Sequence, residues 1–271
     1  MSSNPTICLL GDAILDDYYT LSDKERDLKK ELTDLRFDVY NCATDDVKVV
    51  DVINGIVPNE NYMKSRSYSY PTEKDGKMYP LKSVTSFIGI NKSFASVYDG
   101  IKSFSSFGVS TKPDTMVVIS MGGNDIHSKF GNVILGPEYL INNVITPEFI
   151  SNYKTIIEMI KTSCNKLVLV SIYLPYLGIG SAYGLYAPVA KPVIDKWNKF
   201  IHSLAQEYNI PVLDLSKTLN VGNRSHYGND NTRTSNISNK CIANCISYIY
   251  KNYNGYETYY AANCSKTVTV E

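Results

Sequence analysis

Residues 115–125 read TMVVISMGGND, and this stretch decides the predicted fold. Its first part, residues 115–121, is a short run of apolar and β-branched residues, which is typical of a strand buried on both faces of a sheet. The run ends at Gly122-Gly123, and the polar residues Asn124 and Asp125 follow at once. Ligands of open parallel sheets bind beyond the carboxyl ends of the strands. We therefore expect a buried parallel strand whose carboxyl end presents polar groups to a ligand.

The same pattern recurs on both sides of this stretch. Four further apolar runs are predicted to be strands: 6–10 (TICLL), 37–43 (FDVYNCA), 166–173 (KLVLVSIY) and 210–215 (IPVLDL). Helices are predicted between and after them, over residues 21–35, 147–163, 189–208 and 237–250. Strands that alternate with helices imply parallel pairing, with helices on both faces of the sheet. We therefore predict a three-layer α/β/α fold of the flavodoxin-like kind around a parallel five-stranded sheet.

The length and the punctuation of the chain predict its domain organisation. A chain of 271 residues suits one large domain, which we place over residues 1–250. Residues 59–82 are polar and contain the turn-forming pair Asp75-Gly76, which predicts a β-hairpin insertion. Residues 251–271 are polar and rich in Tyr, and we expect them to form a C-terminal tail.

Composition and charge exclude several classes of function. Lys plus Arg and Asp plus Glu both number 27, so the net charge is zero and no field attracts nucleic acid or an anionic membrane. No apolar run approaches the roughly 18 residues of a membrane span, and the N-terminus lacks signal-peptide features. The six cysteines do not have zinc-site spacing. We expect a cytoplasmic protein without a metal or cofactor, and association with a host cell or virion stays open.

Parallel topology brings the polar clusters that follow the strands to one edge of the sheet. These clusters are residues 11–13, 41–46, 122–125 and 230–235. Here the sequence resembles the SGNH, or GDSL-like, hydrolase family over about residues 6–250, apart from the 59–82 insertion. The resemblance is strongest at GGND (122–125), and LLGDAILDD (9–17) and VLDL (212–215) fit other blocks of the family. It implies a fold of the SGNH-hydrolase type and ester-bond chemistry.

The chemistry of that family gives each motif residue a role. A Ser after Gly-Asp attacks an ester carbonyl, and an oxyanion hole of two backbone N–H groups and an Asn side chain holds the resulting oxyanion. A His that is oriented by an Asp is the base. Carried over to this sequence, the resemblance places Ala13 at the nucleophile, Asp46 at the second backbone N–H and Asn124 at the oxyanion Asn. Asp230 matches the Asp of the triad.

The nucleophile and the base both depart from the family's chemistry. The base position, three residues after Asp230, falls on Arg233, with His226 as the alternative if the loop is arranged differently. An Ala methyl group cannot attack a carbonyl, and an Arg guanidinium cannot accept a proton at neutral pH. Loss of the nucleophile of a Ser hydrolase lowers turnover about a million-fold. The chain as written is therefore predicted to be inactive as an esterase.

Two explanations of Ala13 stay open. In the first, which we favour because Asp46 and Arg233 also depart from the pattern, the chain is a natural pseudoenzyme of this hydrolase lineage. It then binds a small ester or carbohydrate, or acts as a structural or interaction protein with an unidentified protein partner. In the second, it is an active acyl- or acetyl-ester hydrolase represented by an engineered Ser-to-Ala variant, with His226 as its base.

Structural roles compete with these site roles. Asn124 and Asp125 are also suited to cap a helix after the strand, and His127 and His202 fit ordinary surface and helix positions. Several Tyr side chains flank the loop after the fourth predicted strand and either wall a ligand pocket or reflect the Tyr-rich composition. They are Tyr173, Tyr176, Tyr183 and Tyr186. A nucleotide-binding Rossmann-like fold is disfavoured, because no Gly-x-Gly-x-x-Gly follows the first strand.

Overall fold

The computed structural model describes residues 4–12, 14–15, 26–43, 48–49, 115–127, 129, 136–179 and 181–264. The predicted hairpin at 59–82 and two of the predicted site residues, Ala13 and Asp46, lie outside the described residues. None of the helices within the described ranges is both long and apolar enough to cross a lipid bilayer.

The described strands form one parallel sheet in the order β2-β1-β3-β4-β5-β6. The strands are β1 (Thr6–Gly11), β2 (Asp38–Ala43), β3 (Thr115–Ser120), β4 (Lys166–Val170), β5 (Val212–Leu213) and β6 (Thr258–Tyr259). The predicted α/β fold is confirmed, and the predicted number of strands is corrected from five to six. The sixth strand is only two residues long and lies in the Tyr-rich segment, so no hydrophobic run predicted it.

β1 and β3, which both lie between other strands of the sheet, have largely apolar sequences. Every residue of β1 and of β3 is buried, because helices cover both faces of a parallel sheet. The register aligns Gly11 at the end of β1 with Ala43 of β2 and with Ser120 of β3. The carboxyl ends of these three strands are therefore level, and the residues that follow them start from the same edge of the sheet.

Several helices begin at side chains that accept a hydrogen bond from the first turn, as expected of N-caps. Asp27 caps α1, Thr146 caps α8 and Ser235 caps α11. The α-helices are α1 (Leu28–Asp34), α6 (Gly123–His127), α7 (Gly136–Val144), α8 (Pro147–Ser163), α9 (Ala187–Tyr208), α10 (Leu215–Thr218), α11 (Asn236–Lys251) and α12 (Ala261–Cys264). Two short 3₁₀ helices, η5 (Ala182–Leu185) and η6 (Arg224–His226), lie in the loops.

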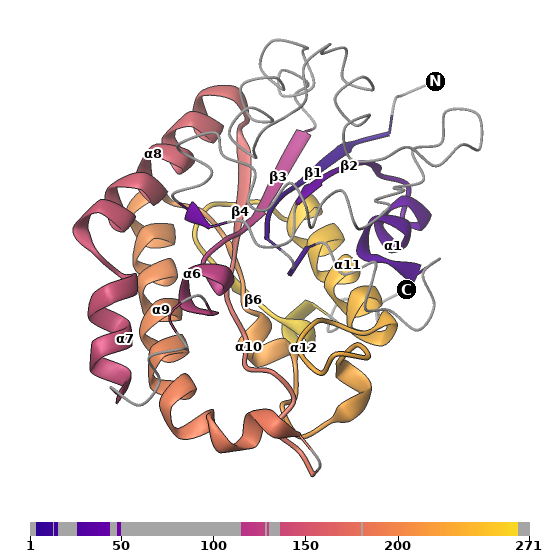
Figure 1. The fold of residues 1–271 in the computed structure, drawn as a ribbon. Coiled ribbons are helices and arrows are strands. Elements are labelled where there is room, and N and C mark those ends of the chain that lie inside the picture. Colours follow the sequence, from indigo (N-terminus) through magenta and orange to yellow (C-terminus); the bar gives the residue numbers. More distant parts are fainter. Residues whose placement is uncertain are drawn as a thin grey trace, which may run out of the picture.

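The helices form a layer on each face of the sheet. Helices α7, α8 and α9 lie together on one side, and α1 and α11 lie on the other (Figure 1). Trp197 of α9 is completely buried in the first layer, where its ring lies 4.8 Å from that of Phe149 in α8. The three-layer α/β/α arrangement is the one predicted, and its two apolar cores hold the strand ends in place.

The segment after α11 is part of the fold over its described residues. The backbone N–H groups of Val212 and Asp214 donate to the carbonyl oxygens of Glu257 and Tyr259, at 2.8 and 2.7 Å, and these bonds add β6 to the edge of the sheet. The hydroxyl of Tyr253 also forms hydrogen bonds of 3.1 Å with both backbone groups of Leu167. Residues 252–264 therefore close one edge of the sheet.

Candidate functional site

Asp12 joins the turn after β1 to the turn after β3. Its backbone N–H donates to the carbonyl oxygen of Ser120 at 2.8 Å. Its buried carboxylate accepts hydrogen bonds from Ser120 Oγ at 3.0 Å, from the N–H of Ile14 at 3.1 Å and from the N–H of Gly123 at 3.3 Å. A buried carboxylate needs such donors to offset the loss of its hydration. The Gly-Asp pair therefore has a structural role whatever residue stands at position 13.

Gly11 and Gly122, which precede Asp12 and Gly123, leave no room for a side chain. Gly11 has a φ of +117°, and a Cβ there would lie 1.7 Å from the carbonyl oxygen of Ser120. Gly122 has a φ of +112°, and a Cβ there would lie 1.7 Å from Cζ2 of Trp197. A side chain at either position would meet both a steric clash and an unfavourable backbone conformation. These two glycines let β1, β3 and α9 approach closely at the carboxyl edge of the sheet.

Asn124 lies directly beyond this contact, as the second residue of α6. Its side chain is half-buried. The residues on either side of position 13 both reach the preceding Gly123: Asp12 by its hydrogen bond, and Ile14 by a side-chain methyl 3.9 Å from where a Cβ of Gly123 would lie. The turn that contains position 13 and the turn that leads into Asn124 are therefore neighbours. Ala13 itself lies outside the described residues.

A third chain segment reaches the same place through Asp125. Its carboxylate accepts a hydrogen bond from the backbone N–H of Val49, with 3.2 Å between Oδ2 and the nitrogen. Val49 follows β2, as does Asp46, which lies outside the described residues. Asp12 thus connects the end of β1 to the end of β3, and Asp125 connects the start of α6 to Val49. His127 ends α6, and its side chain lies outside the described residues.

Asp230 and Arg233, two of the predicted site residues, form an ion pair in the loop before α11. Asp230 Oδ1 accepts the backbone N–H groups of Thr232 and Arg233, each at 3.0 Å, and Oδ2 lies 3.2 Å from Nη1 of Arg233. Thr232 Oγ1 donates to the same carboxylate at 2.6 Å. Burial by itself raises the pKa of this carboxyl, but the hydrogen bonds and the guanidinium charge outweigh it and lower the pKa.

His226 is arranged differently from a base that an Asp orients. Its Nδ1 accepts a hydrogen bond of 3.0 Å from the backbone N–H of Asn220. Its carbonyl oxygen accepts hydrogen bonds from the N–H of Ser235 and from the hydroxyl of Ser238. Among the described contacts, the Asp230 carboxylate is bound by Thr232 and Arg233, whereas the His226 ring is bound by Asn220.

The loop that carries Asp230 packs against the loop after β4. An antiparallel bridge between Tyr227 and Thr234 closes a small hairpin around it. The N–H of Tyr176 donates to the carbonyl oxygen of Asn231 at 2.9 Å, and the ring of Tyr176 lies 6.0 Å from that of Tyr227. Two of the predicted pocket residues, Tyr173 and Tyr176, therefore pack against the Asp230 loop. Tyr186 is exposed at the start of α9.

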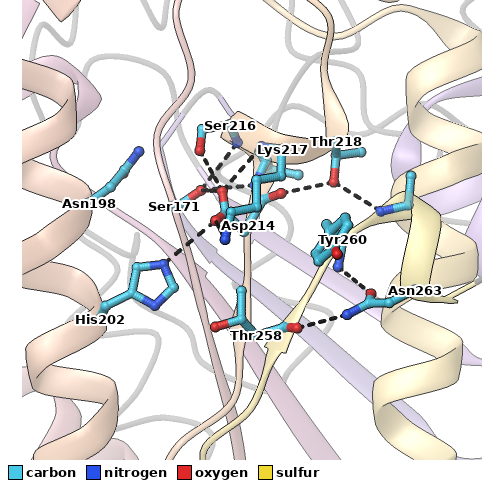
Figure 2. A network of polar contacts seen from close by, with 12 residues as sticks. Ser171, Asn198, His202, Asp214, Ser216, Lys217, Thr218, Thr258, Tyr260 and Asn263 are labelled. Atoms are coloured by element: carbon cyan, nitrogen blue, oxygen red, sulfur yellow. Dashed lines mark hydrogen bonds and ion pairs between the residues drawn. The ribbon is translucent and has the colours of Figure 1, made fainter.

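The sequence analysis missed a second polar centre, around Asp214 (Figure 2). Asp214 follows β5 and caps α10, and its carboxylate accepts Ser171 Oγ at 3.1 Å and Ser216 Oγ at 2.6 Å. Oδ2 lies 3.6 Å from Nε2 of His202 and 3.3 Å from Nζ of Lys217. Burial raises the pKa of this carboxyl, but the bonds from His202 and Ser216 and the charge of Lys217 lower it far more. The sequence feature that could have indicated this centre is an Asp directly after a strand, a pattern that Asp12 shares.

The Asp214 centre does not have the geometry of a nucleophilic triad. Both serine hydroxyls donate to the carboxylate, so neither is bonded to a nitrogen that would take its proton. Ser171 Oγ also accepts the N–H of Leu215 at 2.8 Å. His202, whose side chain is 23% exposed, instead links α9 to the C-terminal segment, with 3.3 Å between Nδ1 and the hydroxyl of Tyr256. We interpret this centre as a joint between β4, α9, α10 and β6.

The comparisons with known proteins show the family and the fold of this chain. A model of the GDSL-like lipase/acylhydrolase family matches residues 93–238, which is more than half of the chain. The matched stretch contains the turn at Gly122-Gly123, Asn124, Asp230 and Arg233. No curated protein matches the chain significantly.

Solved structures are similar to this chain in fold. The lipase/acylhydrolase from Enterococcus faecalis is 17% identical and has a TM-score of 0.52, over 92% of this chain and 96% of that chain. A protein of the lipolytic G-D-S-L family from Desulfitobacterium hafniense is 16% identical and has a TM-score of 0.50, over 92% of this chain and 99% of that chain. At these identities the likeness concerns the arrangement of the elements.

Proposed function

Because this chain belongs to the GDSL-like lipase/acylhydrolase family, we propose that it is a member with an incomplete catalytic site. In this proposal it binds a small ester or carbohydrate at the carboxyl edge of the sheet and does not hydrolyse it. The observation that carries the proposal is the ion pair between Asp230 and Arg233. By the family resemblance, Asp230 and Arg233 stand at the positions of the triad Asp and of the base.

Arg233 stands in place of the base, and it also binds the Asp230 carboxylate that would orient a base. The guanidinium stays protonated at every physiological pH and has no lone pair to accept a proton. It gives the Asp230 carboxylate a positive partner, so the carboxylate has no need of an imidazole. The Thr232 and Arg233 backbone groups fill further acceptor positions of the carboxylate. The loop is thus stable in a form that has no general base.

The contacts around Gly123 support the proposal that this edge of the sheet binds an ester. The Asp12 hydrogen bond holds the turn that contains position 13 next to the turn that leads into Asn124. In the family's chemistry these turns supply the N–H groups and the Asn amide that hold the ester oxygen. By the family resemblance, position 13 carries an Ala in place of the Ser whose hydroxyl attacks the ester. An ester can then be held by its carbonyl without being attacked.

The alternative, an active hydrolase represented by a Ser-to-Ala variant, needs His226 as its base. The bond from the Asn220 N–H takes the lone pair on Nδ1, so the neutral ring carries its proton on Nε2. The Asp230 carboxylate, which would have to orient this ring, is bound to Arg233 instead. These contacts favour the incomplete site over the engineered variant.

Restoring the missing groups one at a time tests the proposal. Hydrolysis of p-nitrophenyl acetate would be measured for the natural sequence, for Ala13→Ser and for the double variant Ala13→Ser with Arg233→His. We expect the first two proteins to stay at the uncatalysed rate, and the double variant to gain at least about tenfold through a restored base. Turnover by Ala13→Ser alone that a sulfonyl fluoride abolishes would overturn the proposal and favour the active hydrolase.

Binding is measured separately, because it does not depend on turnover. Calorimetric titration of the natural protein with glyceryl triacetate and with acetylated xylose oligomers would show whether either class is bound. We expect Asn124→Ala to weaken binding of the preferred ester about tenfold, the effect of one lost hydrogen bond to a carbonyl. Asn252→Ala, on the exposed end of α11, is the matched control. Equal affinities for the two variants would contradict the assigned role of Asn124.

A further inference from the structure

Two large aliphatic side chains stand in water on the loop between β4 and α9. Ile179 is 102% exposed and Leu185 is 85% exposed, more than any other large apolar side chain of the described residues. Tyr186, directly after Leu185, is 48% exposed. In Figure 1 the chain between β4 and α9 extends beyond the sheet at the bottom of the view. Apolar side chains that are exposed together, rather than singly, mark a surface that a partner covers.

Contacts within the loop hold its two halves together. The N–H of Ser181 donates a hydrogen bond of 3.1 Å to the carbonyl oxygen of Gly178. A Cβ on Gly184 would lie 3.7 Å from the carbonyl oxygen of Leu177, so η5 packs against the segment that leads into Ile179. The two exposed aliphatic side chains therefore belong to one small surface, which we call the apolar loop surface.

The loop that carries this surface also contacts the loop of the Asp230 ion pair. The N–H of Tyr176 donates to the carbonyl oxygen of Asn231, and the N–H of Leu177 donates to that of Val221, each at 2.9 Å. Asn231 directly follows Asp230 in the chain. The apolar loop surface is therefore joined to the edge of the sheet at which we propose that an ester binds.

The charge pattern of this segment indicates what kind of partner covers it. Residues 171–190 contain no Asp, Glu, Lys, Arg or His, although charged residues make up 20% of the chain. Arg224 packs against the loop, with its guanidinium carbon 6.0 Å from the ring centre of Tyr176, but its Nη1 donates to the carbonyl oxygen of Tyr227 at 2.7 Å. A charge-free apolar surface suits an uncharged apolar partner, because a charged partner would lose its hydration there without gaining a counter-charge.

We propose that the apolar loop surface docks on a phase of uncharged ester lipid, with Ile179 and Leu185 inserted among the acyl chains. The identification of the lipid as an ester rests on the proposed function, and the inference adds that the ester is drawn from a lipid phase. Hydrogen bonds within the loop lower the cost of moving its backbone out of water. Tyr186 brings an amphipathic ring to the boundary between lipid and water. A protein partner or a second copy needs about 20–30 residues a side, far more than these three side chains.

Insertion into lipid films tests the proposal. A film of dioleoylglycerol, which is an uncharged ester lipid, would be compared with a film of anionic dioleoylphosphatidylglycerol. We expect the full chain to raise the surface pressure of the dioleoylglycerol film equally at low and at high salt, because charge attraction is not involved. The double variant Ile179→Ser with Leu185→Ser should bind this film at least about tenfold more weakly, since two large aliphatic side chains no longer leave water.

Ile237→Ser is the matched control. Ile237 is 62% exposed on α11, outside the loop, so its replacement should leave insertion unchanged. Absence of insertion by the natural protein, equal insertion by the double variant, or binding only to the anionic film that salt abolishes would each overturn the proposal. A dimer in sedimentation velocity that the double variant abolishes would also overturn it, because a second copy would then cover the surface.

Water-soluble esters separate this inference from the proposed function. Glyceryl triacetate needs no lipid surface, so the double variant should bind it as tightly as the natural protein does. If the natural protein inserts into the dioleoylglycerol film but binds neither glyceryl triacetate nor acetylated xylose oligomers, the ester site is refuted and the docking surface is retained. If it binds a soluble ester but does not insert, the docking surface is refuted and the ester site is retained.

Discussion

The backbone N–H of Gly123 donates a hydrogen bond of 3.3 Å to the carboxylate of Asp12, although 111 residues separate them in the chain. This bond connects the turn after β1 with the turn after β3. It is the contact on which the candidate site rests, because it holds Asp12, at the end of β1, beside the start of α6. The same carboxylate also binds Ser120 and Ile14, so it organises both turns.

Asp12→Ala should destabilise the protein strongly. The change leaves the N–H of Gly123, the N–H of Ile14 and the Ser120 hydroxyl without their acceptor in a buried place. We expect the free energy of unfolding to fall by about 2–4 kcal/mol, as for other buried charge-assisted bonds. Urea denaturation followed by circular dichroism measures it. Asp195→Ala, which removes an exposed carboxylate paired with Lys191, should cost less than about 0.5 kcal/mol.

Gly122→Ala tests the close approach of β3 and α9. The new Cβ would overlap the Trp197 ring and would also hold an alanine at a φ of +112°. We expect a loss of roughly 3 kcal/mol or more from overpacking and backbone strain together. Gly136→Ala is the matched control, since its φ is +84° but no atom lies within 4 Å of the added Cβ. The control should show the backbone part alone, about 1–2 kcal/mol, and equal losses would contradict the predicted clash.

The Asp214 centre should make stability depend on pH. Its hydrogen bonds and cationic neighbours hold the pKa of Asp214 in the folded state well below the value of about 3.9 in the unfolded state. The ionised carboxylate therefore adds stability above pH 4, and this contribution is lost as the pH falls towards the folded-state pKa.

Asp214→Asn isolates this contribution from that of other carboxylates. The difference in the free energy of unfolding between the natural protein and Asp214→Asn should be largest near pH 7. Below pH 4 it should shrink by up to about 1.4 kcal/mol per pH unit. Urea denaturation at a series of pH values gives the two curves. A constant difference from pH 7 to pH 3 would show that the Asp214 carboxylate titrates alike in the folded and unfolded states.

Asn198 should be essential for holding the end of β4 against α9. Its Oδ1 accepts the N–H of Ile172 at 2.9 Å and its Nδ2 donates to the carbonyl oxygen of the same residue at 2.8 Å. Asn198→Ala leaves two buried backbone groups unpaired, so we expect a loss of about 2–4 kcal/mol in urea denaturation. Asn252→Ala removes one exposed bond to Tyr248 and should cost less than about 1 kcal/mol.

The layers of the fold could be predicted from the sequence, because each depends on a local pattern. β1 and β3 are apolar at every position or nearly so, and the end of α8 at Ser163 agrees with its apolar spacing. The sixth strand could not be predicted in this way. Thr258 and Tyr259 have no apolar run around them, and they become a strand only because Val212 and Asp214 donate to that segment.

The side-chain contacts of the polar sites could likewise not be predicted from the sequence. The family resemblance indicated the positions of Asp230 and Arg233, whereas the ion pair between them was seen only in the structure. The Asp214 centre brings together Ser171, which directly follows β4, and His202 of α9, and no spacing between these residues in the sequence predicts it (Figure 2).

The sequence by itself determined where the chain turns, which strands are buried and which chemical groups stand at their ends. Backbone sterics and hydrophobic burial act over a few residues and leave a readable pattern. Only the tertiary structure decided which buried carboxylate meets which donor: Asp12 with Gly123, and Asp214 with His202. A buried charge is stable only beside partners that replace its water, and folding brings those partners from distant parts of the chain.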